Sequence, residues 1–158
     1  MKQRDIKLYN IIFPVWLLWL FPLTWIVVLP GNFLIDLLVT VVTMKVLHVE
    51  EIKFNAKKSI LYIWIFGFVS DFIGVILMFA GSTTELLSAV NSNPFENIYS
   101  FLWTTGCVIL SAICIYFFNK KIALRKTALS QTEKKKLSLS LAICTAPYLF
   151  YLPTIWIY

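Results

Sequence analysis

Apolar residues gather along this chain in long stretches that charged or turn-forming residues separate. A membrane-spanning helix needs about 20 apolar residues in succession, with a range of roughly 17 to 25. Inside hydrocarbon every backbone polar group must find its partner within the segment, so such stretches are predicted to be helices. Five stretches qualify, at residues 8–29, 31–48, 59–80, 94–118 and 137–158.

Turn-forming and capping residues lie between these stretches. The sequence Pro30-Gly31-Asn32 predicts a tight hairpin in which Asn32 caps the second helix. Asn55 is a candidate cap for the third helix, and Asn93 is one for the fourth. Ser130 and Glu133 have the spacing of a capping box before the fifth. The pattern therefore predicts an all-α transmembrane bundle of five spans.

Composition supports this interpretation. Hydrophobic residues make up 59% of the 158 residues and charged residues only 14%, whereas soluble domains are roughly 45–50% apolar and about 25% charged. A chain this apolar has too little polar surface to cover itself in water. A soluble enzyme, a nucleic-acid-binding domain and a disordered tail are excluded, and we expect residues 1–158 to form a single transmembrane domain.

The basic residues predict the orientation. The chain carries 14 Lys and Arg and 8 Asp and Glu. All 14 basic residues precede the first stretch, lie between the second and third (Lys45 just inside the second), or lie between the fourth and fifth. Because Lys and Arg stay in the cytoplasm, we expect a cytoplasmic N-terminus and a C-terminus outside. Abundant Lys, Ile and Phe without Ala-rich stretches favour a bacterial cytoplasmic membrane.

Two aspartates inside the stretches are the first candidates for a functional site. A charge at the bilayer centre costs on the order of 2.5–3.5 kcal/mol on insertion scales. Asp71 lies about twelve residues into the third stretch, beside Ser70. By helical spacing it shares a face with Gly67 and Gly74, and small residues allow close approach of another helix. We expect Asp71 to face the bundle interior, either as an ion-, proton- or solute-binding carboxylate or as a structural acid.

Asp36 belongs to a polar stripe of Asn32, Asp36, Thr40 and Thr43 on the second stretch. Near a helix N-terminus its carboxylate would be favoured by the helix dipole, and a purely structural role is an equal alternative. At 1.5 Å per residue, Asp36 and Asp71 have similar predicted depths. A short connection between these antiparallel neighbours would allow both carboxylates to share one outward-facing pocket, but the sequence leaves open whether they meet.

Prolines give a second indication, because interrupted hydrophobic segments often mark binding sites in transporters. The first stretch contains Pro14 and Pro22, and the fifth contains Pro147 and Pro153. Side chains near these prolines are candidates to line a site: Trp16, Trp19, Thr24, Thr145, Tyr148 and Tyr151. The alternative is that the prolines are ordinary transmembrane prolines and that the tryptophans pack against lipid.

These patterns favour a transport-related protein, either a small solute or ion carrier or the substrate-binding membrane subunit of a larger transporter. The alternative is a membrane regulator, immunity factor or assembly scaffold that docks partners through the basic segment 119–136. No phosphate-binding loop, nucleophile elbow or zinc-protease motif occurs in the sequence, so we expect no enzymatic activity, cofactor or metal site. Expected partners are the bilayer, a small ligand, and further copies or a larger membrane complex, but no nucleic acid.

Overall fold

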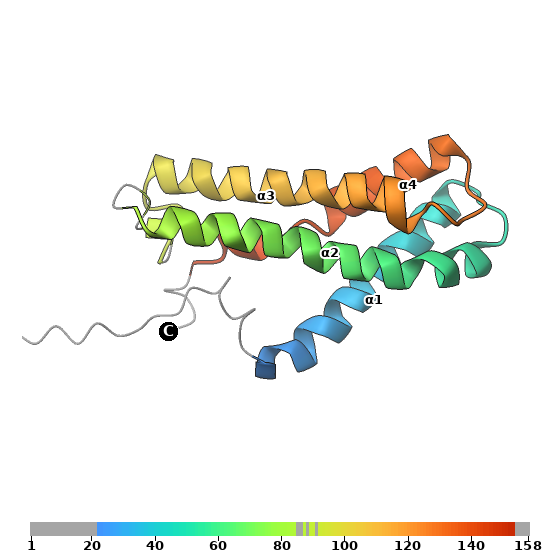
Figure 1. The fold of residues 1–158 in the computed structure, drawn as a ribbon, viewed down its shortest axis with the longest axis horizontal. Helices are drawn as coiled ribbons and strands as arrows, with labels where there is room; N and C mark the ends of the chain where they lie inside the picture. The colour runs from blue at the N-terminus through green and yellow to red at the C-terminus, as the bar shows by residue number, and fades with distance from the viewer. Residues whose placement is uncertain (1–21, 85–86, 88, 91, 154–158) are drawn as a thin grey trace, which may run out of the picture.

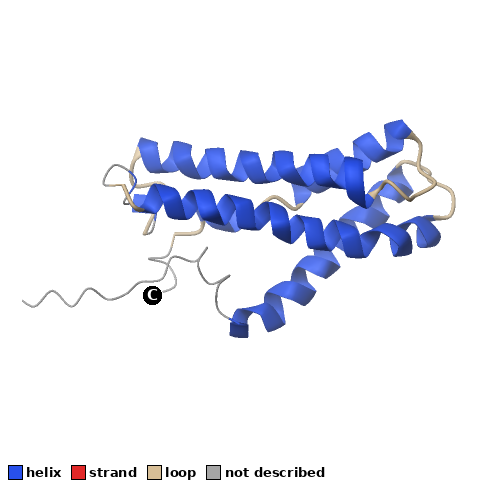
Figure 2. Ribbon diagram, in the orientation of Figure 1, coloured by secondary structure: helices blue, strands red, loops and turns tan. Residues whose placement is uncertain are grey.

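A computed structural model describes residues 22–84, 87, 89–90 and 92–153 of the chain. Regular structure in this part of the chain is helical (Figure 1, Figure 2), which confirms the predicted all-α fold. Four α-helices follow one another: α1 (Pro22–Val46), α2 (Ile52–Ser82), α3 (Ile98–Phe118) and α4 (Gln131–Cys144). A π-helical turn, η3 (Asn119–Ala123), continues α3, and a 3-10 turn, η4 (Tyr148–Tyr151), follows α4.

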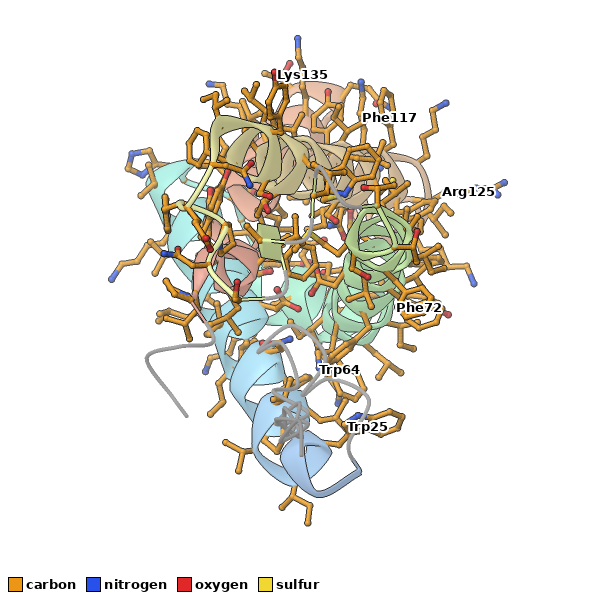
Figure 3. All side chains as sticks on the ribbon, turned by 90° about the vertical axis from the view of Figure 1, so that its left-hand side faces the viewer. Trp25, Trp64, Phe72, Phe117, Arg125 and Lys135 are labelled. Atoms are coloured by element: carbon orange, nitrogen blue, oxygen red, sulfur yellow. The ribbon has the colours of Figure 1, made fainter. Side chains whose placement is uncertain are left out.

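Three helical segments of the described chain are long and apolar enough to cross a membrane. They are Trp25–Val46, Ile52–Ser82 and Ile98–Ala123, with mean hydropathies of 2.0 to 2.2. Many of their apolar side chains face outward; Ile26 and Val27 are more than 70% exposed, and Phe72 and Phe117 project away from the helices in Figure 3. Side chains of this kind are stable against lipid rather than water, so the chain is a membrane protein.

The hairpin predicted at residues 30–32 is wrong, because α1 runs without interruption through Pro30, Gly31 and Asn32. No glycine in the described chain adopts a positive φ, so Gly31 makes no turn. Proline removes only one helical hydrogen bond, whereas a turn at this depth would leave several backbone groups unsatisfied in lipid. Asn32 is therefore not a cap, and Asp36 lies mid-helix, beyond the reach of the helix dipole. Residues 8–21 of the predicted first span lie outside the described chain.

Small residues bring α2 and α3 close together. A Cβ atom built on Gly74 would collide with Ser111 Oγ of α3, and one built on Gly81 would collide with the indole ring of Trp103. Trp103 Nε1 also donates a hydrogen bond of 3.1 Å to the Leu77 carbonyl of α2. Glycine is therefore required at both positions for this separation of the two helices, as predicted for Gly74.

The N-terminus of α3 differs slightly from the prediction. Asn97, rather than Asn93, caps the helix, and its Oδ1 accepts a hydrogen bond of 2.8 Å from Ser100 N. Asn93 Oδ1 instead accepts from Phe95 N at 3.0 Å and closes a short turn before the helix. The predicted span 94–118 thus corresponds to α3 with this turn before it, and the predicted span 59–80 lies within α2.

The last predicted span is not one helix. α4 begins at the predicted capping box, in which Ser130 N donates to Glu133 Oε2 at 2.7 Å and Glu133 N donates to Ser130 Oγ at 3.3 Å. The helix ends at Cys144, and η4 starts only at Tyr148. Pro147 explains the break, because it has no amide proton and disfavours helical backbone in the preceding residue. The prediction of one continuous helix is therefore wrong for residues 137–153, and residues 154–158 lie outside the described part.

Asn55 joins the two connections at one end of the bundle. It is not the predicted cap, since α2 already begins at Ile52. Its buried side chain donates to the Glu50 and Glu51 carbonyls, at 3.2 and 3.3 Å, and accepts a hydrogen bond of 3.0 Å from Ala128 N. The α1–α2 turn and the α3–α4 connection are thereby fixed to each other.

All eleven basic residues of the described chain lie at this same end, on or beside the two connections (Figure 1). They are Lys45, Lys53, Lys57, Lys58, Lys120, Lys121, Arg125, Lys126, Lys134, Lys135 and Lys136. The fold therefore collects on one end the charges that the sequence distributes over two connections.

Candidate functional site

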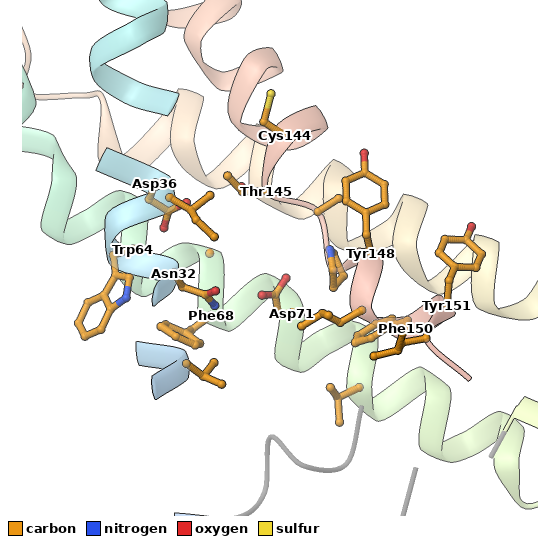
Figure 4. Close-up of a pocket in the computed structure, with 18 of the residues that line it drawn as sticks. Asn32, Asp36, Trp64, Phe68, Asp71, Cys144, Thr145, Tyr148, Phe150 and Tyr151 are labelled. Atoms are coloured by element: carbon orange, nitrogen blue, oxygen red, sulfur yellow. The ribbon is translucent and has the colours of Figure 1, made fainter. Parts of the chain in front are cut away.

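A cavity of about 700 Å³ lies between α1, α2 and the segment that joins α4 to η4 (Figure 4). Asn32 and Asp36 reach it from α1, while Trp64 and Asp71 reach it from α2. Its remaining wall is formed mainly by residues 144–153, where α4 breaks. The cavity is thus bounded by two long helices and by a stretch of chain that is not α-helical.

A glycine of α2 leaves room for Asp36 to pack closely against that helix. The residue is only 6% exposed, and its Oδ2 lies 3.6 Å from the point that a Cβ atom on Gly67 would occupy. Gly67 precedes Asp71 by about one helical turn. Figure 4 shows both carboxylates directed into the same space, with Asn32 lying between them in that view. The structure therefore brings the two predicted aspartates together on one cavity.

One of the carboxylate oxygens is buried without a hydrogen-bond partner in the described chain. Asp71 Oδ1 is inaccessible to solvent and accepts no hydrogen bond. Within the described residues no basic side chain lines the cavity, and all eleven basic residues lie at the end that carries the two connections. Burying a charged group without a partner costs several kcal/mol. Ionisable groups that a membrane protein keeps in such a position are functional candidates by default.

The other polar side chains of the cavity wall are already bonded within the protein. Thr145 Oγ1 donates to the Leu141 carbonyl at 2.8 Å, and Tyr148 OH donates to the Ile143 carbonyl at 2.6 Å. Tyr151 OH donates to a threonine of α3, Thr105, at 2.9 Å. The Tyr148 bond satisfies one of the carbonyl groups that the early end of α4 leaves without a helical partner. In all three residues the hydroxyl proton is donated within the protein.

Trp64 is fixed in the same way. Its Nε1 donates to the Leu29 carbonyl of α1 at 3.1 Å, and its ring makes edge-to-face contacts with Phe33 and Phe68, with centroid distances of 6.0 and 5.4 Å. The indole thus links α1 to α2 and presents apolar surface to the cavity.

Four of the eight residues predicted for the site line the cavity: Asn32, Asp36, Asp71 and Tyr148. Thr145 and Tyr151, the other candidates near the C-terminal prolines, line it as well.

The other four predicted residues do not. Thr40 and Ser70 are fully buried and do not line the cavity; Ser70 Oγ donates to the Phe66 carbonyl at 2.7 Å, while Thr40 Oγ1 has no partner in the described chain. Trp16 and Trp19 lie outside the described residues.

Sequence reasoning missed the aromatic wall. Trp64 and Phe68 line the cavity, as do Phe95 and Phe150. A signal for two of them is present, because Trp64 and Phe68 precede Asp71 by seven and three residues and so share its helical face. Phe95 and Phe150 lie outside regular α-helix, and periodicity gives no information there.

The cavity offers few ligands for a metal ion. In the part of the chain that is described, no three side chains of His, Cys, Asp or Glu gather closely enough to hold one. The two aspartates are therefore a pair of acceptors in an otherwise apolar and aromatic space. Chemically, the pair can hold a proton, a cation or a hydrogen-bond donor.

No protein-family model matches the chain, and neither the curated proteins nor the solved structures searched contain a match.

Proposed function

We propose that this membrane protein binds a small solute in the cavity between α1, α2 and the broken α4, and that this binding serves transport rather than catalysis. The observation that carries the proposal is the pair of carboxylates, Asp36 and Asp71, on a cavity of about 700 Å³ that no basic side chain of the described chain lines. Cavities of roughly 300–1,000 Å³ with mostly apolar walls and a few polar groups are typical of small-molecule sites. Irregular backbone at membrane depth is tolerated where it lines a cavity, as residues 145–147 do.

The orientation follows from the basic residues. Since Lys and Arg are retained on the cytoplasmic side, we place the end that carries the α1–α2 turn in the cytoplasm and η4 toward the outside of a bacterial cell membrane. With few spans per chain, a carrier of this size is expected to self-associate or to join a larger membrane complex.

A second candidate function is partner docking through the basic end, as in a regulator or scaffold. The observation that favours it is the bond between Asn55 and Ala128, which fixes the α3–α4 connection and the cations beside it. The triple variant Lys134→Glu, Lys135→Glu, Lys136→Glu tests this candidate. Loss of a co-purifying partner with normal yield in membranes would support it, and unchanged recovery would oppose it.

Filling the cavity tests the leading proposal. Val28 lines the cavity, whereas its neighbour Val27 does not and is 75% exposed. We compare Val28→Trp with the matched control Val27→Trp. Purified protein is screened by thermal unfolding against neutral, anionic and cationic small solutes, and stabilising solutes are then tested for uptake into proteoliposomes.

At least one solute should stabilise the wild-type protein and the Val27→Trp variant and enter proteoliposomes that contain them. Val28→Trp, Asp36→Asn and Asp71→Asn should each lose both effects at normal yield. The proposal fails if no solute depends on the cavity, or if uptake persists in Val28→Trp.

A further inference from the structure

We infer that the ligand of this cavity is a small organic cation, an ammonium group on an aromatic or aliphatic body. The inference rests on the proposed function and specifies its substrate class. Three observations support it: the hydrogen-bond donors and acceptors of the cavity wall, the C-terminal end of α4 at the cavity, and the absence of basic residues from the wall within the described chain.

The cavity presents acceptors and almost no donors. The side-chain protons of Trp64, Thr145, Tyr148 and Tyr151 are all donated within the protein. Asp71 Oδ1 accepts no hydrogen bond within the described chain, and Asp36 is nine-tenths buried. Asn32 is the polar side chain that still offers both functions. While the two aspartates are ionised, their carboxylates can only accept hydrogen bonds. A ligand that supplies protons to them, as an ammonium does and a carboxylate or phosphate does not, fits this wall.

The broken helix adds to this preference. α4 ends at Cys144, and Cys144, Thr145 and Ala146 all line the cavity. A helix C-terminus carries a partial negative charge from its free carbonyl groups. In transporters, the C-terminal ends of interrupted helices at membrane depth coordinate cations. The end of α4 and the two carboxylates thus favour the same sign of charge.

The apolar and aromatic composition of the cavity wall favours an organic cation over an inorganic one. A bare metal ion needs several oxygen ligands close together, whereas most of the cavity wall is apolar or aromatic. Aromatic faces such as those of Trp64 and Phe68 attract an ammonium through cation–π interaction and cover an apolar body. No basic residue among the described ones lines the cavity to repel such a ligand.

The test uses three probes with one carbon skeleton: 4-phenylbutylammonium, 4-phenylbutanol and 4-phenylbutanoate. Cys144 is exposed and lines the cavity, so its alkylation by N-ethylmaleimide reports occupancy. The full chain carries Cys107→Ala and Cys114→Ala and is held in lipid nanodiscs. Thermal unfolding is the second measurement, and sodium chloride at equal ionic strength is the fourth condition.

The ammonium should slow alkylation of Cys144 and raise the unfolding temperature, while the alcohol, the carboxylate and sodium should do neither. Asp36→Asn and Asp71→Asn should weaken the ammonium effect by roughly tenfold to a hundredfold, the range for losing a charged hydrogen-bond partner. Asp71→Glu should restore most of it. Glu96→Gln, which removes an exposed acid that does not line the cavity, should leave it unchanged.

Equal protection by the alcohol or the carboxylate would overturn the cation assignment while leaving the cavity as a solute site. Protection by sodium alone would replace the organic cation with an inorganic one. An ammonium effect that persists unchanged in both asparagine variants would refute the inference, as would the absence of any effect. The Val28→Trp screen judges the solute site independently of these outcomes.

Discussion

Gly74 provides the sharpest test of how the bundle is packed. A Cβ atom at this position would collide with Ser111 Oγ of α3 and lie 2.8 Å from Phe150 Cε2 of η4. Gly106 of α3 is also inside a helix, but a Cβ atom there would meet nothing within 4 Å. Replacing either glycine by alanine gains the same helix propensity, about 0.5–1 kcal/mol. Comparing the two variants therefore isolates the steric effect.

Inserting a methyl group into a well-packed interior costs typically about 1–3 kcal/mol. We expect Gly106→Ala to raise the free energy of unfolding. The free energy of unfolding of Gly74→Ala should be lower than that of Gly106→Ala by about 1–3 kcal/mol. The assay is reversible unfolding in mixed micelles of detergent and SDS. Removing the nearest obstacle, in the double variant Gly74→Ala/Ser111→Gly, should recover part of the loss after correction for Ser111→Gly alone. Equal stabilities of Gly74→Ala and Gly106→Ala would refute the packing described here.

Three further predictions concern the end of the bundle that carries the basic residues. Ser130→Ala should lower the free energy of unfolding by about 0.5–2 kcal/mol. The Ser130 hydrogen bonds lower the pKa of Glu133. The contribution of the ionised Glu133 to the cap should therefore be full above its ordinary pKa of about 4.3 and be lost as the pH falls through the lower folded value, which unfolding measured from pH 7 to pH 3 will show. Asn55→Ala should cost about 0.5–1.5 kcal/mol, the net value of a hydrogen bond, since the Ala128 amide loses its acceptor. An unchanged unfolding midpoint would contradict this bond. Both polar atoms of the buried Asn119 side chain lack partners in the described chain, so Asn119→Leu should be neutral or stabilising in the same assay. A loss of more than about 1 kcal/mol would instead indicate that Asn119 is hydrogen-bonded.

Periodicity and capping chemistry predicted the parts of this fold in which one local signal dominates. The Ser130–Glu133 capping box is found where it was expected, because its hydrogen bonds involve only neighbouring residues. Asp36 and Thr40, two members of the polar stripe that spacing places on one helical face, are both buried.

The errors arose where local signals compete with the membrane or with distant residues. Pro30-Gly31-Asn32 is a strong turn signal in water, yet a helix passes through it, because unsatisfied backbone groups in lipid are more costly than one missing hydrogen bond. Asn55 has the chemistry of a cap, but its partner is Ala128, 73 residues away. Spacing within a single segment contains no information on such a contact.

The glycines of α2 show how one helix positions the whole cavity. Gly67, Gly74 and Gly81 are seven residues apart, and a repeat of seven drifts by about 20° around a straight helix. The glycines thus stay near one face but lie about 10 Å apart along the axis, and each meets different neighbours: Asp36 of α1 faces Gly67, Ser111 and Phe150 crowd Gly74, and Trp103 covers Gly81. Gly67 admits the carboxylate, while Gly74 admits the ring that closes the far wall. A methyl group at Gly74 would displace η4, so Gly74→Ala should lower both the ligand affinity and the free energy of unfolding. Gly81 does not line the cavity, so Gly81→Ala should lower the free energy of unfolding alone.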